Sequence, residues 1–147
     1  MLKEAFLTIF ERDLRTLKNE IGQYRNEADL WVVKPGISNS AGNLCLHLIG
    51  NLKHFVGAVL GQTGYVRERE REFSDKNVPR ETLLASIDET IEVVKKALGD
   101  LPDDMFDQNF PVEKRGETVK TDFMLLHLFG HFSYHLGQIN YHRRLIS

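Results

Sequence analysis

The sequence is poor in cysteine and proline and has no strong excess of either charge. It contains one cysteine and four prolines, and its 19 Lys and Arg residues against 21 Asp and Glu residues leave a net charge of −2. One cysteine excludes an intramolecular disulfide and is typical of a reducing compartment. The charge balance gives no attraction to nucleic acid or to an anionic membrane.

Long hydrophobic runs are also missing. No apolar run approaches the ~20 residues that span a bilayer, and the N-terminal residues carry charges at Lys3, Glu4 and Glu11, as a helix does and a signal peptide does not. We therefore expect a cytoplasmic protein without a membrane partner. The 147 residues, of which 41% are hydrophobic, suffice for a core. Without repeats or a linker, residues 1–147 are predicted to form a single domain.

Apolar residues recur with helical spacing in four segments, which are residues 3–22, 41–60, 80–98 and 121–145. Asn39 or Ser40 is a suitable N-cap for the second segment, and Thr121 or Asp122 for the last. The pattern predicts an all-α fold, a four-helix bundle with long connecting loops.

Two connections have patterns of their own. Phe110 and Val112 alternate before a Lys-Arg-Gly turn, which predicts a short β-hairpin ahead of the last helix. Arg and Glu alternate from residue 67 to residue 72, so their charges sum to zero, whereas a nucleic-acid surface would need one sign. We interpret residues 61–79 as a solvated segment with local ion pairs, with a place at the rim of a pocket as the alternative.

The last helix carries four of the six histidines. His127, His131 and His135 follow at steps of four, so each lies about 40° round the helix and about 6 Å along it from the one before. Gln138 and His142 return to nearly the same face. Because the flanking residues are apolar, this stripe should face inward, where buried imidazoles need partners.

A second polar stripe lies on the helix predicted over residues 41–60. Its members are Asn43, His47, Asn51 and His54, spaced four, four and three apart on an otherwise apolar helix. Two inward stripes of amides and imidazoles in one short chain indicate that they meet, and a metal ion is the partner that we expect them to share.

His131 and His135 are spaced so that both can reach one ion at about 2.0–2.1 Å. His47 is the third ligand that we predict, since it lies in the middle of the facing stripe. His54 competes with His47 for this place, about 10 Å further along the same face. His127 could instead pair with His131.

The other polar residues of the two stripes suit supporting roles. Gln138 and Asn51 are suited to orient a ligand imidazole or to hold a bound water, and His54 is a further candidate for such a role. For His54, His127 and His142 a structural or supporting role is favoured over ligation.

The residues around the histidines can be compared with the motifs of known metal sites. A zincin motif needs Glu after the first histidine, but Phe132 follows His131, and no glutamate stands three residues before a histidine as in di-iron bundles. Haem is an alternative, although converging imidazoles suit a bare ion better. Three neutral nitrogens favour zinc, nickel, copper or iron, with manganese a further option, over magnesium or calcium. They also leave positions open, as catalytic sites do.

These motifs resemble a known family. GNLCLHLIGNLKHF, then REREREF, then HFSYHLGQIN in the last helix are similar to the DinB/YfiT-like superfamily of metalloenzymes, most of all to a subgroup with a Gly-Asn-Leu-x-Leu-His-Leu-x-Gly-Asn-Leu motif. The likeness covers nearly the whole chain, and the terminal His-x-x-x-His-x-Gly-Gln is its most specific part. The resemblance implies a four-helix bundle, often a homodimer, that binds a divalent metal, commonly nickel or zinc, through His47, His131 and His135.

The resemblance implies less about the reaction. Activities attached to relatives are thiol-dependent S-transfer, with bacillithiol or mycothiol as co-substrate, and an isomerase, while many members are assigned only as hydrolases. We expect a metal-dependent enzyme acting on a small molecule, by S-transfer with a low-molecular-weight thiol or by hydrolysis. A thiol supplies its own nucleophile, which suits a site without a carboxylate base. The alternatives are a non-catalytic metal or small-ligand binding protein and a bundle with purely structural polar stripes.

Overall fold

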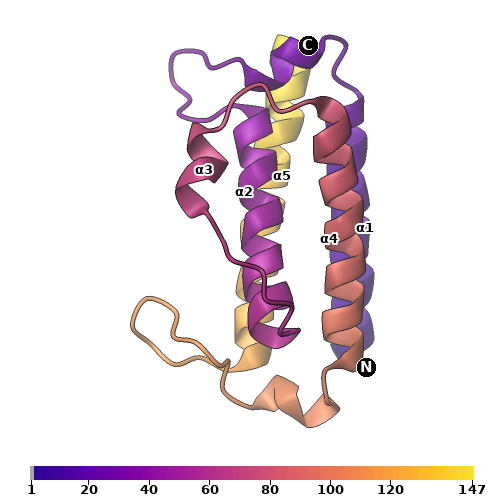
Figure 1. The fold of residues 1–147 in the computed structure, drawn as a ribbon, viewed down its shortest axis with the longest axis vertical. Helices are drawn as coiled ribbons and strands as arrows, with labels where there is room; N and C mark the ends of the chain where they lie inside the picture. Colours follow the sequence, from indigo (N-terminus) through magenta and orange to yellow (C-terminus); the bar gives the residue numbers. More distant parts are fainter. Residues whose placement is uncertain (1) are drawn as a thin grey trace.

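The computed structural model describes residues 2–147, which form four long helices lying side by side and one short helix (Figure 1). The α-helices are α1 (Leu2–Gly22), α2 (Ala41–Leu52), α3 (Arg69–Ser74), α4 (Arg80–Asp100) and α5 (Thr121–Ile146). The predicted all-α fold is confirmed. None of the described helices is both long enough and apolar enough to cross a membrane.

Each long helix turns an apolar face toward one shared core. On α1 the buried residues are Phe6, Phe10, Leu14, Leu17 and Ile21, at the helical spacing seen in the sequence. α1 packs mainly along α4, and α5 packs against both α1 and α2. Burial of a large apolar side chain contributes about 1.5–3 kcal/mol, so these faces hold the bundle together.

α2 begins as predicted and then changes its hydrogen-bonding pattern. The Ser40 hydroxyl accepts a hydrogen bond from the backbone N–H of Asn43 at 3.1 Å, which caps the helix. After Leu52 the chain continues as a π-helix, η2 (Lys53–Leu60), with wider turns. The helix predicted to end near residue 60 is therefore continuous in space, but only its first part is α-helical.

The predicted β-hairpin before α5 is wrong. The connection contains a 3-10 turn, η3 (Asp103–Asp107), and two isolated bridges, Asn109 with Lys120 and Lys114 with Glu117, and no strand forms in residues 2–147. Pro111 has no N–H to donate to a ladder, and Phe110 is buried in the core. The turn itself lies where the sequence placed it, since Arg115 and Gly116 have positive φ angles.

The predicted caps of α5 are wrong by one residue. The helix starts at Thr121, and Lys120 occupies the N-cap position without a side-chain hydrogen bond to the helix. The Thr121 hydroxyl instead donates to the carbonyl of Gln108 at 3.0 Å, which fixes the preceding connection against the start of α5.

Candidate metal centre

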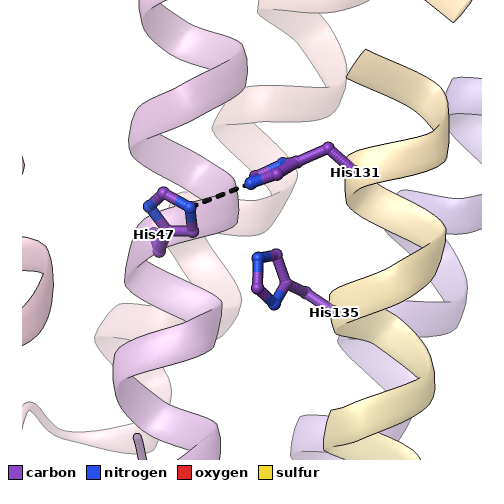
Figure 2. Close-up of side chains that lie close together, drawn as sticks. All are labelled: His47, His131 and His135. Carbon is purple, nitrogen blue, oxygen red and sulfur yellow. Dashed lines mark hydrogen bonds between the residues drawn. The ribbon is translucent and has the colours of Figure 1, made fainter. Parts of the chain in front are cut away.

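Three histidines from two helices face one another between α2 and α5 (Figure 2). His47 lies on α2, and His131 and His135 lie on α5. One ring nitrogen from each can be chosen so that all three lie within 4.8 Å of one another. The Nε2 atoms of His47 and His131 are 3.0 Å apart. The structure thus brings together the three residues that the sequence predicted as ligands.

α2 and α5 run in opposite directions (Figure 1). In an antiparallel pair, one residue on α2 can lie between two residues that are one turn apart on α5, and His47 lies in this way against His131 and His135. His54 lies about two turns further along, in η2, and therefore nearer the beginning of α5. It packs edge-on against the neighbouring ring of Phe55 and lies outside the three-histidine group.

The spacing of two of these donors fits a metal ion. Two nitrogens that are each about 2.0–2.1 Å from one ion lie roughly 2.9–3.4 Å apart in octahedral or tetrahedral geometry, and the 3.0 Å between His47 and His131 falls in this range. The His131 Nδ1 atom is buried without a hydrogen-bond partner. The polar contacts of this ring are therefore all on the Nε2 side, which faces the other two histidines.

The protonation of these rings also suits coordination. Burial, followed by the neighbouring His135, His47, His127 and Arg67, lowers the pKa of His131 to about 4. Burial also lowers the pKa of His135, although its hydrogen bond with Gln138 opposes this. Both rings are neutral at neutral pH, and neutral imidazole is the form that binds a metal.

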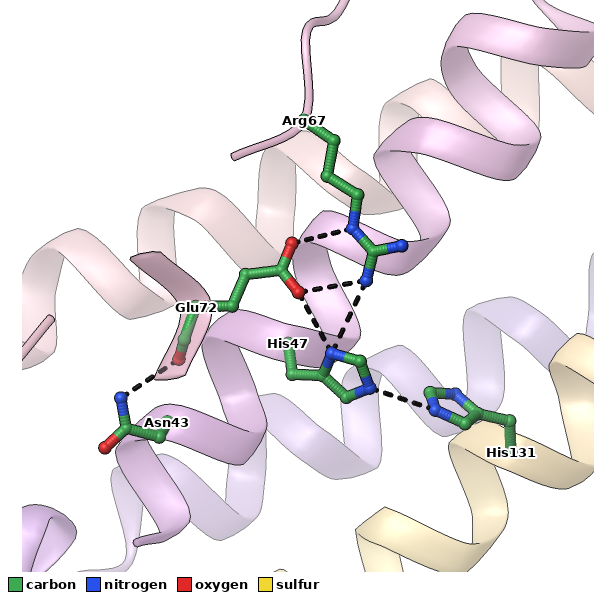
Figure 3. A network of polar contacts seen from close by, with 5 residues as sticks. All are labelled: Asn43, His47, Arg67, Glu72 and His131. Atoms are coloured by element: carbon green, nitrogen blue, oxygen red, sulfur yellow. Dashed lines mark hydrogen bonds and ion pairs between the residues drawn. The ribbon is translucent and has the colours of Figure 1, made fainter. Parts of the chain in front are cut away.

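A buried carboxylate from α3 holds His47 in place (Figure 3). Glu72 Oε1 is 2.9 Å from His47 Nδ1, and Arg67 donates to both oxygens of this carboxylate, from Nη2 at 2.9 Å and from Nε at 2.8 Å. Burial raises the pKa of Glu72, but the hydrogen bonds from His47 and Arg67 outweigh burial and leave the pKa below its ordinary value. An ionised Glu72 accepts the Nδ1–H of His47, so the lone pair of His47 lies on Nε2, toward the other histidines.

Two residues of α2 let α3 approach this closely. A Cβ atom on Gly50 would collide with the Glu72 carboxylate, so only glycine leaves space there. The Asn43 side-chain amide donates to the backbone carbonyls of Glu72 at 3.0 Å and Asp75 at 2.8 Å. Asn43, His47 and Gly50 lie on successive turns of one face, and together they seat α3 on α2.

The interpretation of residues 61–79 as a solvated segment is wrong for Arg67 and Glu72. Residues 68–71 are exposed as expected, but the Glu72 side chain is only 7% exposed and the Arg67 side chain 11%. The alternation of Arg and Glu gave no sign of which charge turns inward. The adjacent Phe73, whose ring packs on His47 at 4.8 Å, was the one apolar signal that could have shown it.

The residues predicted to support the ligands differ in whether they contact the three histidines. Gln138 does what the sequence suggested, because its Oε1 atom lies 2.7 Å from His135 Nδ1. Asn51 is buried on the same face of α2, but within residues 2–147 it makes no hydrogen bond to the three histidines. His127 is exposed and lies one turn before His131.

His142 has a structural role at the far end of α5. Its Nδ1 atom lies 2.7 Å from the Tyr24 hydroxyl, and its Nε2 atom lies 2.8 Å from the carbonyl of Val32. Both nitrogens of this buried ring are thus engaged, one with Tyr24, two residues after α1, and one with the connection to α2. These contacts are those of a structural histidine, the role that the sequence favoured for His142 over ligation.

Fold and site together define a four-helix-bundle protein with a three-histidine group between its second and last long helices. The chain belongs to the DUF1572 family, described as "Protein of unknown function", whose family model matches residues 3–147. A search of curated proteins found no match.

Proposed function

We propose that this protein belongs to the DinB/YfiT-like superfamily and binds a divalent metal ion, nickel or zinc, through His47, His131 and His135. The observation that carries the proposal is the convergence of three imidazoles from two helices. Two of these rings are oriented by further hydrogen bonds, His47 by Glu72 and His135 by Gln138. Such outer partners are typical of metal-binding histidines.

The chemistry that we propose is activation of a thiol or water in a metal-dependent enzyme acting on a small molecule. A bound ion would lower the pKa of either group and, with three protein ligands, leave positions for it. Glu72 is ionised and engaged with His47 and Arg67, and no other carboxylate joins the three-histidine group in the described chain. A site without a general base favours a substrate that supplies its own nucleophile, so we place thiol-dependent S-transfer before hydrolysis.

The protein's own cysteine does not supply this nucleophile. Cys45 is fully buried, and burial raises the pKa of its thiol to about 12. The thiol therefore has to come from a low-molecular-weight co-substrate, such as bacillithiol or mycothiol in a cytoplasmic setting. The missing base also fits a non-catalytic metal-binding protein, which is the second candidate.

Metal analysis followed by an activity screen tests the proposal. The purified protein should bind about one equivalent of zinc or nickel, and the His47→Ala/His131→Ala double variant should bind none at the same concentration. The His54→Ala variant is the matched control and should keep its metal. Full metal content in the double variant would refute the ligand set. Metal-loaded protein that transfers thiols to electrophiles would support the enzyme, and inactivity across thiol and hydrolase substrates would favour the binding protein.

A further inference from the structure

One positively charged side chain lies directly beside the three-histidine group without being one of the proposed ligands. Arg67 belongs to the connection between η2 and α3, and its side chain is only 11% exposed. Its Nη2 atom is 3.4 Å from Nδ1 of His47, and Nε2 on the other side of the same ring faces His131. A single imidazole ring therefore separates this guanidinium from the point where the three histidines meet.

The protein uses only part of this guanidinium. Nε and Nη2 of Arg67 both donate to the carboxylate of Glu72, but a guanidinium has five N–H donors. Within residues 2–147 Nη1 donates to no acceptor, and it points away from Glu72 (Figure 3). Nδ1 of His47 carries the proton that it donates to Glu72 and so does not accept from Nη2. The free edge of Arg67, formed by Nη1 and the second N–H of Nη2, is left for an acceptor from outside the chain.

The free edge is held in a fixed orientation. Two hydrogen bonds to one carboxylate set the plane of the Arg67 guanidinium, which also lies over the Phe55 ring, with Cζ 5.9 Å from the ring centroid. A side chain fixed in this way loses little conformational entropy when it binds a ligand. Two parallel N–H donors on one edge match the two oxygens of a carboxylate.

The charges near the three-histidine group also favour a negatively charged ligand. The pKa of His127, one turn before the ligands on α5, is lowered first by burial and then by the positive charges of Lys114 and Arg115. Glu72 supplies a negative charge, but Arg67 already pairs with it. No carboxylate joins the three-histidine group in the described chain, so a divalent ion would add positive charge without compensation. Such surroundings attract anions.

We infer that the free edge of Arg67 binds the carboxylate of a small anionic substrate, whose reacting end then lies at the three-histidine group. This inference rests on the proposed function and names the class of substrate for that site. Because one imidazole ring separates the guanidinium from the histidines, the carboxylate lies only a few bonds from the reacting group. Glu72 thus orients two groups, the ligand His47 and the substrate-binding Arg67.

Two thiols of similar size test the inference, because a thiolate binds zinc wherever the ion is held. Isothermal titration of the zinc-loaded protein should give a Kd at least about tenfold lower for 3-mercaptopropionate than for uncharged 2-mercaptoethanol. Arg67→Lys should remove this preference and leave the Kd of 2-mercaptoethanol within about threefold, since one ammonium group cannot pair with Glu72 and present two parallel donors as well. The matched control is Arg71→Lys, a 62% exposed cation of α3, which should keep the preference.

Two results of these titrations would overturn the inference. One is equal binding of the two thiols by the wild type, and the other is an unchanged preference in folded Arg67→Lys, which would assign the preference to the ion alone. Far-ultraviolet circular dichroism checks that each variant is folded.

A second measurement does not need the metal or the variant. If the protein holds no zinc, the proposed metal site fails, and Arg67 is then tested by titrating propionate into isotope-labelled, metal-free wild-type protein. The nuclear magnetic resonance signal of the Arg67 Nε–H should shift and saturate, whereas that of the exposed Arg71 should not. The same titration decides the question if Arg67→Lys does not fold. An Arg67 signal that stays in place would overturn the inference whether or not the protein binds zinc.

Discussion

Replacement of Glu72 by glutamine tests whether the α3 carboxylate controls the metal affinity of the three-histidine group. Glutamine has the same shape, but it is neutral and has only one accepting oxygen. Oε1 of Glu72 faces both His47 Nδ1 and Arg67 Nη2, and its other oxygen faces Arg67 Nε. If the glutamine oxygen faces His47, its NH₂ group meets the Arg67 Nε–H and two donors oppose each other. If it faces Arg67 Nε, the hydrogen bond to His47 is lost.

Two effects of different size should follow from Glu72→Gln. Loss of a group that orients a ligand histidine typically lowers metal affinity about 10–100-fold. Arg67 and Glu72 are both nearly buried, and breaking a buried ion pair on one side costs up to about 3–5 kcal/mol. The amide keeps part of the hydrogen bonding, so we expect the free energy of unfolding to fall by about 2–4 kcal/mol.

Isothermal titration with zinc, alongside urea unfolding, separates the two effects. Glu68→Gln is the matched control, because this carboxylate is 65% exposed and its ion pair with Arg71 is 3.5 Å long. It should change neither quantity. Arg67→Gln should lower stability while leaving the ionised Glu72 on His47, so its zinc Kd should rise less than that of Glu72→Gln. If Glu72→Gln binds zinc within threefold of wild type and loses as much stability as Arg67→Gln, Glu72 serves only to attach α3.

Three further outcomes are expected. Gly50→Ala should destabilise the protein by about 1–3 kcal/mol and weaken zinc binding, because a Cβ atom would displace the Glu72 carboxylate. An unchanged melting temperature and an unchanged zinc Kd would contradict this close contact between α3 and α2. The pKa of His131 is about 4 in the folded protein, against 6.5 ordinarily, so the unfolded chain takes up this proton at a higher pH than the folded chain does. The free energy of unfolding of the metal-free protein should therefore fall by about 1–2 kcal/mol between pH 6.5 and 4, after allowance for partial exposure. Urea unfolding of His131→Gln, which should lack this fall, checks the prediction. His142→Phe should lower the free energy of unfolding by about 1–3 kcal/mol through loss of the hydrogen bonds to Tyr24 and Val32, and the zinc stoichiometry should not change. Loss of zinc binding in this variant would show that the role of His142 is not only structural.

The spacing of residues was enough to predict the four long helices and the three converging histidines. Apolar residues at helical intervals determine which side of each helix is buried, and steps of four along α5 put His131 and His135 on one face wherever that helix packs. His47 could be chosen as the third ligand because its own stripe had to face inward as well. These inferences depend only on the repeat of a single helix, which is a local property of the backbone.

Only the tertiary structure decided how the connections contribute. Arg67 and Glu72 looked like their exposed neighbours, because the alternation of charge is the same whichever residue turns inward. Their burial depends on the return of residues 61–74 across α2, where Gly50 leaves space and Asn43 binds the α3 backbone. The expected hairpin failed for a related reason, since the core took up Phe110 and Pro111 could not extend a ladder. Which of these residues are buried depends on contacts between residues far apart in the sequence, and the local spacing of residues does not predict such contacts.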